Sequence, residues 1–257
     1  MVTMAFKPYP EWTTVQGLTW LPKDPTLQNF EFLFFGHANG LVVTLDRTVV
    51  MPMISSLVTS TLGTAIAVIC GTLSSYAVVR FGQAPSMPLS ILQLRLFPPL
   101  AVMIPVMVMW AFMGAIDTWW GLSIIYGIVT LPFGFWLMKT FFEEVPIEIE
   151  EAARVAGSSR FRVFWKITLP IVKPGLATCV LFVFIMNWSD YLLALLLTQK
   201  EWVTLPVYMS TLSAAMSGQM YGMKAALGIL AAVPPVVFGL LIQKHLVRGL
   251  TFGALKQ

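Results

Sequence analysis

The residues of this chain that could do chemistry gather in one polar segment, at about 142–170, between two long apolar runs. Glutamate, arginine and lysine side chains are concentrated there, whereas the flanking runs avoid charge. In an otherwise apolar chain, such a segment indicates a surface that a soluble partner contacts. The chemistry that it predicts is polar recognition rather than catalysis.

The nucleophilic and metal-ligating side chains elsewhere form no pattern typical of an enzyme. Cys70 and Cys179 lie inside apolar runs, with neither metal-ligand spacing nor a disulfide framework. His37 and His245 are isolated, and the chain has no Gly-rich phosphate-binding loop. We therefore predict that the chain binds no metal or cofactor itself and is not an enzyme, which also disfavours a membrane-embedded catalyst.

Composition indicates the class of protein. Hydrophobic residues make up 57% of the chain and charged residues 11%, with a mean hydropathy of +0.79. A soluble domain of 257 residues needs far more charge to cover its surface. The prediction is an all-α, polytopic membrane protein. Its net charge of +4 is distributed over loops, which indicates topology and lipid contact rather than nucleic-acid binding.

A helix needs about 20 apolar residues to cross the hydrocarbon core. Five stretches meet this test: 49–79, 89–113, 119–141, 171–198 and 225–245. The first is rich in Ser, Thr and Gly, which predicts close helix packing. Prolines predict kinks in three of the others. They are Pro98, Pro99 and Pro105 in the second span, Pro132 in the third, and Pro234 and Pro235 in the last.

Basic residues predict the orientation, because cytoplasmic loops carry an excess of Lys and Arg. They occur in alternate loops and near the C-terminus: Arg80, Lys139, Arg154, Arg160, Arg162, Lys166, Lys173, Lys244 and Arg248. We therefore expect the 142–170 loop and the C-terminus to be cytoplasmic. Residues 1–47 are then an extracytoplasmic segment and 48–257 a transmembrane domain. Tryptophans near the outer boundary fit an aromatic belt: Trp12, Trp119, Trp120 and Trp202.

The polar loop is predicted to form two short helices. Pro146 and the glutamates after it suit a first helical turn, and Gly157 suits its end. Ser158 or Ser159 can cap a second helix, in which apolar side chains follow helical spacing among basic ones. The pattern alone leaves two interpretations open. The segment is either an amphipathic helix lying on the lipid or a surface that docks into a partner.

A family resemblance favours docking. The sequence Glu151-Ala152-Ala153, followed by Gly157 and then Ile167, Leu169 and Pro170, resembles the EAA loop of bacterial ATP-binding-cassette import permeases. The likeness runs almost end to end and is closest to carbohydrate-importer permeases of the maltose-permease type. The other similar motifs are Ser74–Arg80, Phe97–Pro99, Ile104–Pro105, Leu131–Phe133, Trp188–Tyr191 and Val247–Lys256. The resemblance implies a type I importer permease bundle.

Three departures from that family stand out. Ala156 precedes Gly157 where the family usually has Asp, which removes a potential helix-end contact. Ser189 stands where Asn is usual. The family normally has six helices, the first ending before a stretch that resembles Met4–Pro8, so we expect a first helix to be missing from this sequence.

The resemblance implies partners: a second, similar permease, two ATPase subunits that bind ATP and Mg, and a soluble binding protein. It implies import, across a bacterial inner membrane, of a sugar, oligosaccharide or sugar alcohol. The residues expected to couple the permease to the ATPase are Glu151, Ala152, Ala153, Gly157, Arg160, Arg162, Leu169 and Pro170. Glu151 is expected to make a polar contact, Ala152 and Ala153 to allow close approach, and Gly157 to permit the turn.

Candidates for the translocation pathway are Trp188, Asp190 and Tyr191. An ionisable side chain within a span, such as Asp190, usually faces the bundle interior, although a structural hydrogen bond explains it equally well. The two aromatic rings could stack on a sugar, or simply pack. A rival function is a secondary transporter driven by an ion gradient. Such a transporter is expected to have paired acidic residues within the membrane and internal repeats. Asp190 alone supports it thinly.

Overall fold

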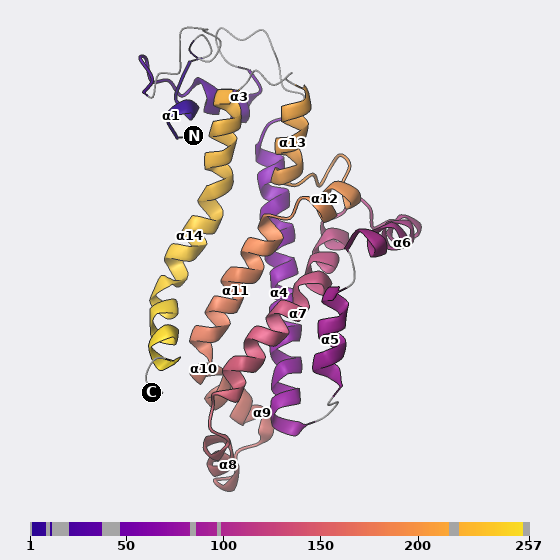
Figure 1. Ribbon diagram of the computed structural model, residues 1–257, viewed down its shortest axis with the longest axis vertical. Helices are drawn as coiled ribbons and strands as arrows, with labels where there is room; N and C mark the ends of the chain where they lie inside the picture. Colours follow the sequence, from indigo (N-terminus) through magenta and orange to yellow (C-terminus); the bar gives the residue numbers. More distant parts are fainter. Residues whose placement is uncertain are drawn as a thin grey trace.

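The computed structural model describes residues 2–8, 11, 21–37, 47–82, 86–96, 99–215 and 221–253. Every regular element within these residues is a helix, and together they form an elongated bundle (Figure 1). The helices are α1 Val2–Ala5, α3 Gln28–Phe35, α4 Val50–Phe81, α5 Met87–Leu96, α6 Pro99–Phe112, α7 Trp119–Glu143, α8 Ile147–Val155, α9 Arg160–Val163, the π-helix η1 Phe164–Thr168, α10 Leu169–Ile171, α11 Lys173–Trp188, α12 Leu192–Leu197, α13 Leu205–Ala215 and α14 Tyr221–Gly253.

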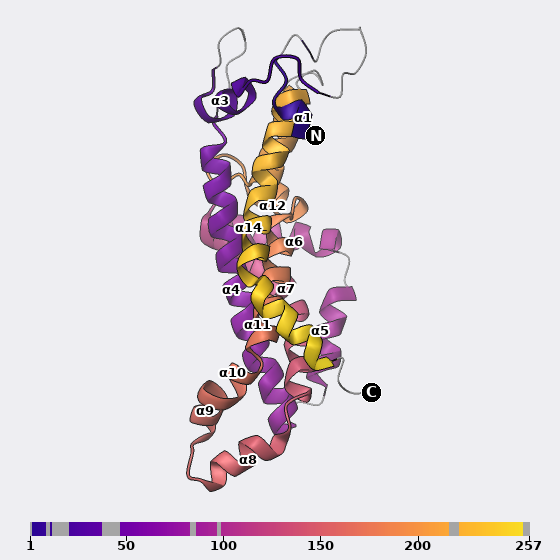
Figure 2. The ribbon, with the colours of Figure 1, turned by 90° about the vertical axis from the view of Figure 1, so that its left-hand side faces the viewer.

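Three helices of the described residues are long and apolar enough to cross a membrane: α4, α7 and α14. These helices coincide with the expected spans at 49–79 and 119–141, and the third candidate span, Tyr221–Gln243, overlaps the expected span at 225–245. A fourth crossing arises if the segment 160–171 and α11, which meet at an angle of 75°, count as one bent span. The prolines predicted to kink α7 and α14 lie within helices that continue through them, and α14 is visibly curved (Figure 2).

The predicted span at 89–113 takes a different form. It consists of α5 and α6, of 10 and 14 residues, and neither reaches the length of a membrane crossing. Pro99 begins α6, because proline suits a first helical turn but cannot donate the hydrogen bond that would continue a preceding helix. Phe97 and Pro98 lie outside the described residues. In Figure 1, α6 runs across the direction of α5.

Small residues hold α4 against α7, the most closely packed pair in the bundle. A Cβ added to Gly71 would lie 2.8 Å from the backbone nitrogen of Phe135, and one added to Gly63 would lie 2.6 Å from the Cβ of Tyr126. Both distances are shorter than the non-bonded contacts that a real Cβ atom makes, so the two backbones approach this closely only because glycine is present. The packing predicted from the Ser, Thr and Gly content of the first span is therefore observed.

The two ends of the bundle differ. The segment from α8 to α10 projects from one end, whereas α1, α3 and α13 gather at the other (Figure 1). Helix α14 begins beside α1, against which it packs, and ends toward the half that carries α10. Residues of the expected extracytoplasmic segment thus lie opposite the expected cytoplasmic loop. Trp12 lies outside the described residues.

A single carboxylate ties two loops together at the end opposite α8. Asp117 adopts a left-handed backbone conformation with φ of 56°. Its Oδ1 accepts backbone N–H bonds from Gln199 (3.1 Å) and Trp202 (3.0 Å), and its Oδ2 accepts from Lys200 (2.8 Å) and Glu201 (2.9 Å). Partial burial works to raise the pKa of this carboxyl, but the four donors outweigh it, and the pKa lies below its ordinary value.

Candidate functional site

The polar loop folds into a hairpin, residues 146–171, whose first arm is α8. Pro146 directly precedes the helix, and Glu148 and Glu150 lie in its first turn, where negative charge favours the helix dipole. Glu150 is buried against the bundle, with 6% of its surface exposed. Glu151 and Ala152 are exposed on the other face. The arm therefore presents one face to the bundle and one to its surroundings.

The turn of the hairpin requires glycine. Gly157 has φ of 86°, in the left-handed region that favours a residue without a Cβ. The N–H of Gly157 donates to the carbonyl of Arg154, and that of Ser158 to the carbonyl of Ala153, each at 3.0 Å. These two bonds form a Schellman motif, which closes α8 through the backbone alone. The predicted break at Gly157 is confirmed, and Ala156, at the C-cap, leaves the closure intact.

The second arm is irregular. Ser159 caps α9 by accepting a hydrogen bond from the N–H of Arg162 at 3.3 Å, which confirms one of the two predicted caps. The helix then widens into η1, a π-helical segment of a kind that is rare and frequently found at functional sites. After α10, the chain bends at Val172 into α11.

Large apolar side chains are exposed around the turn. Val155 is 90% exposed and Phe161 is 74% exposed, and Trp165 is half-exposed further along the second arm. Val155 lines a surface concavity together with polar and charged residues, namely Glu151, Arg154, Ser158, Ser159 and Arg160. Exposed apolar groups rimmed by charge are typical of a protein interaction site. The geometry therefore suits docking.

The predicted coupling residues lie together on this hairpin. Most are exposed, namely Glu151, Ala152, Gly157, Arg160, Arg162 and Pro170, whereas Ala153 and Leu169 are half-buried. The guanidinium of Arg160 lies over the ring of Phe81, 5.1 Å from its centroid, so this side chain contacts the bundle. Their role in coupling stays a prediction.

The sequence did not single out Glu150 as a contact residue. Its carboxylate accepts hydrogen bonds from Arg80 Nε at 2.7 Å and from the hydroxyl of Tyr76 at 2.9 Å. Successive residues of a helix point about 100° apart, so the adjacent glutamates 150 and 151 lie on different faces of α8. That periodicity, together with Arg80 as an isolated basic residue at the end of the first span, is the signal that could have indicated the pairing of Glu150 with Arg80.

The predicted pathway residues lie around the end of α11. Trp188 is buried, stacks on Phe184 and donates from Nε1 to the carbonyl of Ala231 at 3.0 Å. Asp190 follows α11 rather than lying within it, and its Oδ1 accepts from the N–H groups at the start of α12 at 2.9 and 3.4 Å. Tyr191 is 42% exposed. Packing and capping account for the first two side chains, and their role in a pathway stays a prediction.

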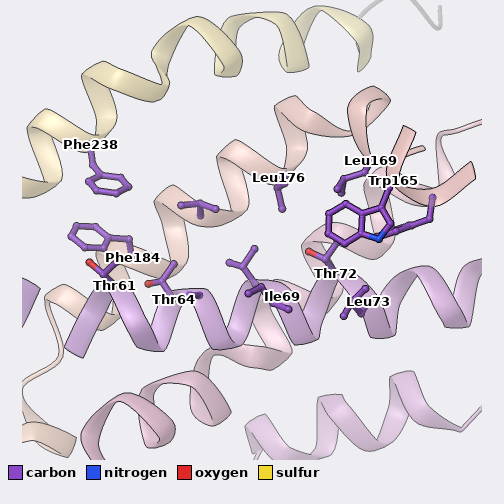
Figure 3. A pocket seen from close by; sticks show the side chains of 14 residues that line it. Thr61, Thr64, Ile69, Thr72, Leu73, Trp165, Leu169, Leu176, Phe184 and Phe238 are labelled. Carbon is purple, nitrogen blue, oxygen red and sulfur yellow. The ribbon is translucent and has the colours of Figure 1, made fainter. Parts of the chain in front are cut away.

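An apolar groove of about 430 Å³ runs between α4, α11 and α14 (Figure 3). Its walls include Ile69, Leu73, Leu176 and Phe238, and Trp165 of the hairpin closes one end. Such walls offer few partners for the hydroxyl groups of a sugar. Within the described residues, no group of three or more His, Cys, Asp or Glu side chains could hold a metal ion.

Comparison with known proteins agrees with this architecture. The family described as binding-protein-dependent transport system inner membrane component matches residues 63–252. The trehalose transport system permease protein SugB of Mycobacterium tuberculosis (strain CDC 1551 / Oshkosh) is 32% identical over 249 residues, which are 95% of this chain and 87% of the relative. The maltodextrin transport system permease protein MdxG of Bacillus subtilis (strain 168) is 37% identical over 183 residues, 71% of this chain and 66% of the relative.

Solved structures share the fold. A chain of a bacterial ABC transporter involved in the import of the acidic polysaccharide alginate aligns with a TM-score of 0.73 and 22% identity, over 94% of this chain and 87% of that one. A second structure, of the bacterial alginate ABC transporter in complex with an alginate pentasaccharide-bound periplasmic protein, aligns with a TM-score of 0.61 and 16% identity, over 75% and 76%.

The helix bundle and its projecting hairpin thus define a multi-pass membrane permease. The chain belongs to the family of inner-membrane components of binding-protein-dependent transport systems. The resemblance inferred from the EAA loop is confirmed, since the matched relatives include permease proteins of trehalose and maltodextrin transport systems.

Proposed function

We propose that this chain is the permease subunit of an ATP-driven importer for a sugar, and that its 146–171 hairpin docks on a separate ATPase subunit. Docking is supported by the exposure of Val155 and Phe161, which lie near the charged Glu151 and Arg162 at one end of an apolar bundle. Water disfavours such apolar exposure unless a partner covers it.

The hairpin has the features that docking requires. Glu151 is free to make a polar contact with the ATPase, and the exposed Ala152 lets a partner approach the helix closely. Gly157 holds the turn through its left-handed backbone. ATP and Mg are bound by the partner, and this chain binds neither. Closure of the ATPase pair on ATP pushes the hairpin, which moves the membrane helices between inward-open and outward-open arrangements.

The substrate class follows from the relatives. Trehalose and maltodextrin permeases match most of this chain, so we propose a sugar or oligosaccharide as the solute, with a sugar alcohol as a close variant. A soluble binding protein delivers it, and a second, similar permease completes the membrane pore. The family membership disfavours the alternative of an ion-gradient-driven carrier.

The proposed orientation puts the hairpin and the C-terminus in the cytoplasm. The support comes from the excess of basic residues in the polar loop and from the position of the hairpin opposite α1 and α3. The membrane is then the bacterial inner membrane, and residues 1–47 face outward.

The test is gentle purification of the protein from its native membranes, with mass spectrometry of the proteins that accompany it. We expect a subunit with a Gly-rich phosphate-binding loop and a second permease, each in stoichiometric amount. Recovery of this chain alone under conditions that preserve other importers would contradict the proposal and favour the secondary transporter.

A further inference from the structure

Glu150 carries a buried charge of the hairpin, and its partners come from another helix. The side chains of Glu150 and Arg80 are 8% and 7% exposed, and Glu150 Oε1 lies 2.7 Å from Arg80 Nε. Arg80 also donates from Nη2 to the carbonyl of Val145 at 2.8 Å, and Tyr76 donates its hydroxyl to Glu150 Oε2 at 2.9 Å. Arg80 thus binds both helix α8, through Glu150, and the segment that leads into it, through Val145.

The second arm of the hairpin reaches the same part of α4. The ring of Phe164, in η1, lies 4.6 Å from the ring of Tyr76, and Arg160, in α9, lies over Phe81. Three of the four helical elements of the hairpin, α8, α9 and η1, therefore contact residues 76–81, the last turns of α4. Tyr76 is the point where both arms meet.

Helix α4 is suited to carry motion away from this point. It continues unbroken for 32 residues and packs along α7 through glycine contacts that fix the two backbones closely. By contrast, α14 packs mainly on α11, and the apolar groove separates it from α4 (Figure 3). Helices α4 and α7 thus form one closely packed unit, with the apolar groove next to α4. The hairpin contacts one end of that unit, at residues 76–81.

We propose that Glu150, Arg80 and Tyr76 are positioning residues that transmit displacement of the hairpin to α4, so that ATP hydrolysis on the partner moves the transport pathway. A buried ion pair is weak as a source of stability, because desolvation offsets its attraction, but it fixes geometry through directional bonds. This inference rests on the proposed docking of an ATPase, and it assigns the step that follows docking.

Two variants test the connection in the full complex, reconstituted in proteoliposomes. Tyr76→Phe removes only the hydroxyl that binds Glu150 and keeps the ring against Phe164. Glu150→Gln removes the charge and keeps the shape of the side chain. We expect ATPase subunits to assemble with both variants and to hydrolyse ATP. The sugar transported per ATP hydrolysed should fall by about fivefold or more, the scale of coupling between linked sites.

The matched control is the ion pair of Lys139 and Glu143 on α7, at the same end of the bundle but outside the hairpin. The double variant Lys139→Gln/Glu143→Gln should keep the wild-type ratio, because partly exposed helix pairs contribute little. A third variant, Arg80→Lys, tests whether positive charge alone at this position is sufficient. A lysine keeps the charge but cannot bond both Glu150 and Val145 as the guanidinium does, so the ratio should stay low.

The outcomes separate the two proposals. A wild-type ratio of transport to hydrolysis in both Tyr76→Phe and Glu150→Gln would overturn the transmission role. Loss of ATPase binding in Glu150→Gln would also overturn it, since the residue would then serve docking. Failure of the unmodified chain to bind any ATPase would instead defeat the proposed function.

Discussion

At the scale of single residues, Asp117 shows how a loop is fixed by one carboxylate. We expect Asp117→Ala to lower the free energy of unfolding by about 2 kcal/mol, because four backbone donors lose a charged acceptor. Asp117→Asn is the matched control, since asparagine tolerates the left-handed backbone and keeps one oxygen. Thermal unfolding in detergent measures both. Equal transition temperatures for wild type and Asp117→Ala would contradict this role.

The same carboxylate predicts a pH dependence with a defined sign. Its pKa is lower in the folded protein than its ordinary value of 3.8. The stabilisation is therefore complete above that value and is lost as the pH falls through the lower, folded pKa. Thermal unfolding of wild type should become more acid-sensitive than that of Asp117→Asn below about pH 4, where carboxyl groups titrate. Parallel pH profiles for the two proteins would count against the prediction.

Gly157 gives a second test at this scale. Gly157→Ala should strain the turn by about 1 kcal/mol, because a φ of 86° is unfavourable for alanine, although the space beside the glycine is open. Gly157→Pro also removes the N–H that donates to Arg154, and we expect it to abolish uptake while the bundle still folds. Gly239→Ala is the control, since that glycine lies in α14 with open space and no unusual φ. Normal uptake by Gly157→Pro would argue that the hairpin has no coupling role.

Sequence reasoning at the residue scale succeeded where the chemistry is local. The break at Gly157 and the cap at Ser159 depend on neighbours a few residues away, and both were predicted. Glu150 and Asp117 were not singled out as contact residues, because Arg80 is 70 residues from the first and the donors to the second are 82 to 85 residues away. Which of two adjacent glutamates is buried depends on contacts that no local pattern contains.

At the scale of elements, the exposed apolar side chains of the hairpin predict an interface. Phe161→Ala and Val155→Ser should each weaken ATPase binding, by about tenfold for the aromatic side chain, since interface energy concentrates in a few apolar anchors. Phe112→Ala is the matched control, because Phe112 is 88% exposed but lies in α6, outside the hairpin. Affinity measured by titrating the ATPase onto the purified permease checks this. An equal effect of all three substitutions would exclude a localised interface.

Elements were predicted from the sequence as far as apolar length decides them. Uninterrupted runs gave α4, α7 and α14 correctly. The 89–113 run divides into α5 and α6, because prolines remove backbone donors at a position where length alone suggested a crossing. The predicted span at 171–198 ends earlier, at Trp188, and continues as the separate helix α12. Apolar composition cannot show where a backbone turns.

At the scale of the whole molecule, the predicted topology places the two ends of the bundle on opposite sides of the membrane. In a background with Cys70→Ser and Cys179→Ser, we expect Glu144→Cys, which is exposed next to the hairpin but outside it, to react with a membrane-impermeant thiol reagent only in inverted vesicles. Gln199→Cys should react only in intact spheroplasts. Labelling of both positions from the same side would contradict the positive-inside assignment.

In the proposed importer, this permease moves its solute only when a partner hydrolyses ATP, and uptake of radiolabelled sugar by proteoliposomes measures that dependence. The vesicles contain this chain, its partner permease and the ATPase, with the binding protein and its sugar outside. We predict accumulation that requires ATP inside and the binding protein outside, and that is indifferent to an imposed proton or sodium gradient. Uptake driven by such a gradient without ATP would contradict ATP-driven import and favour a secondary transporter.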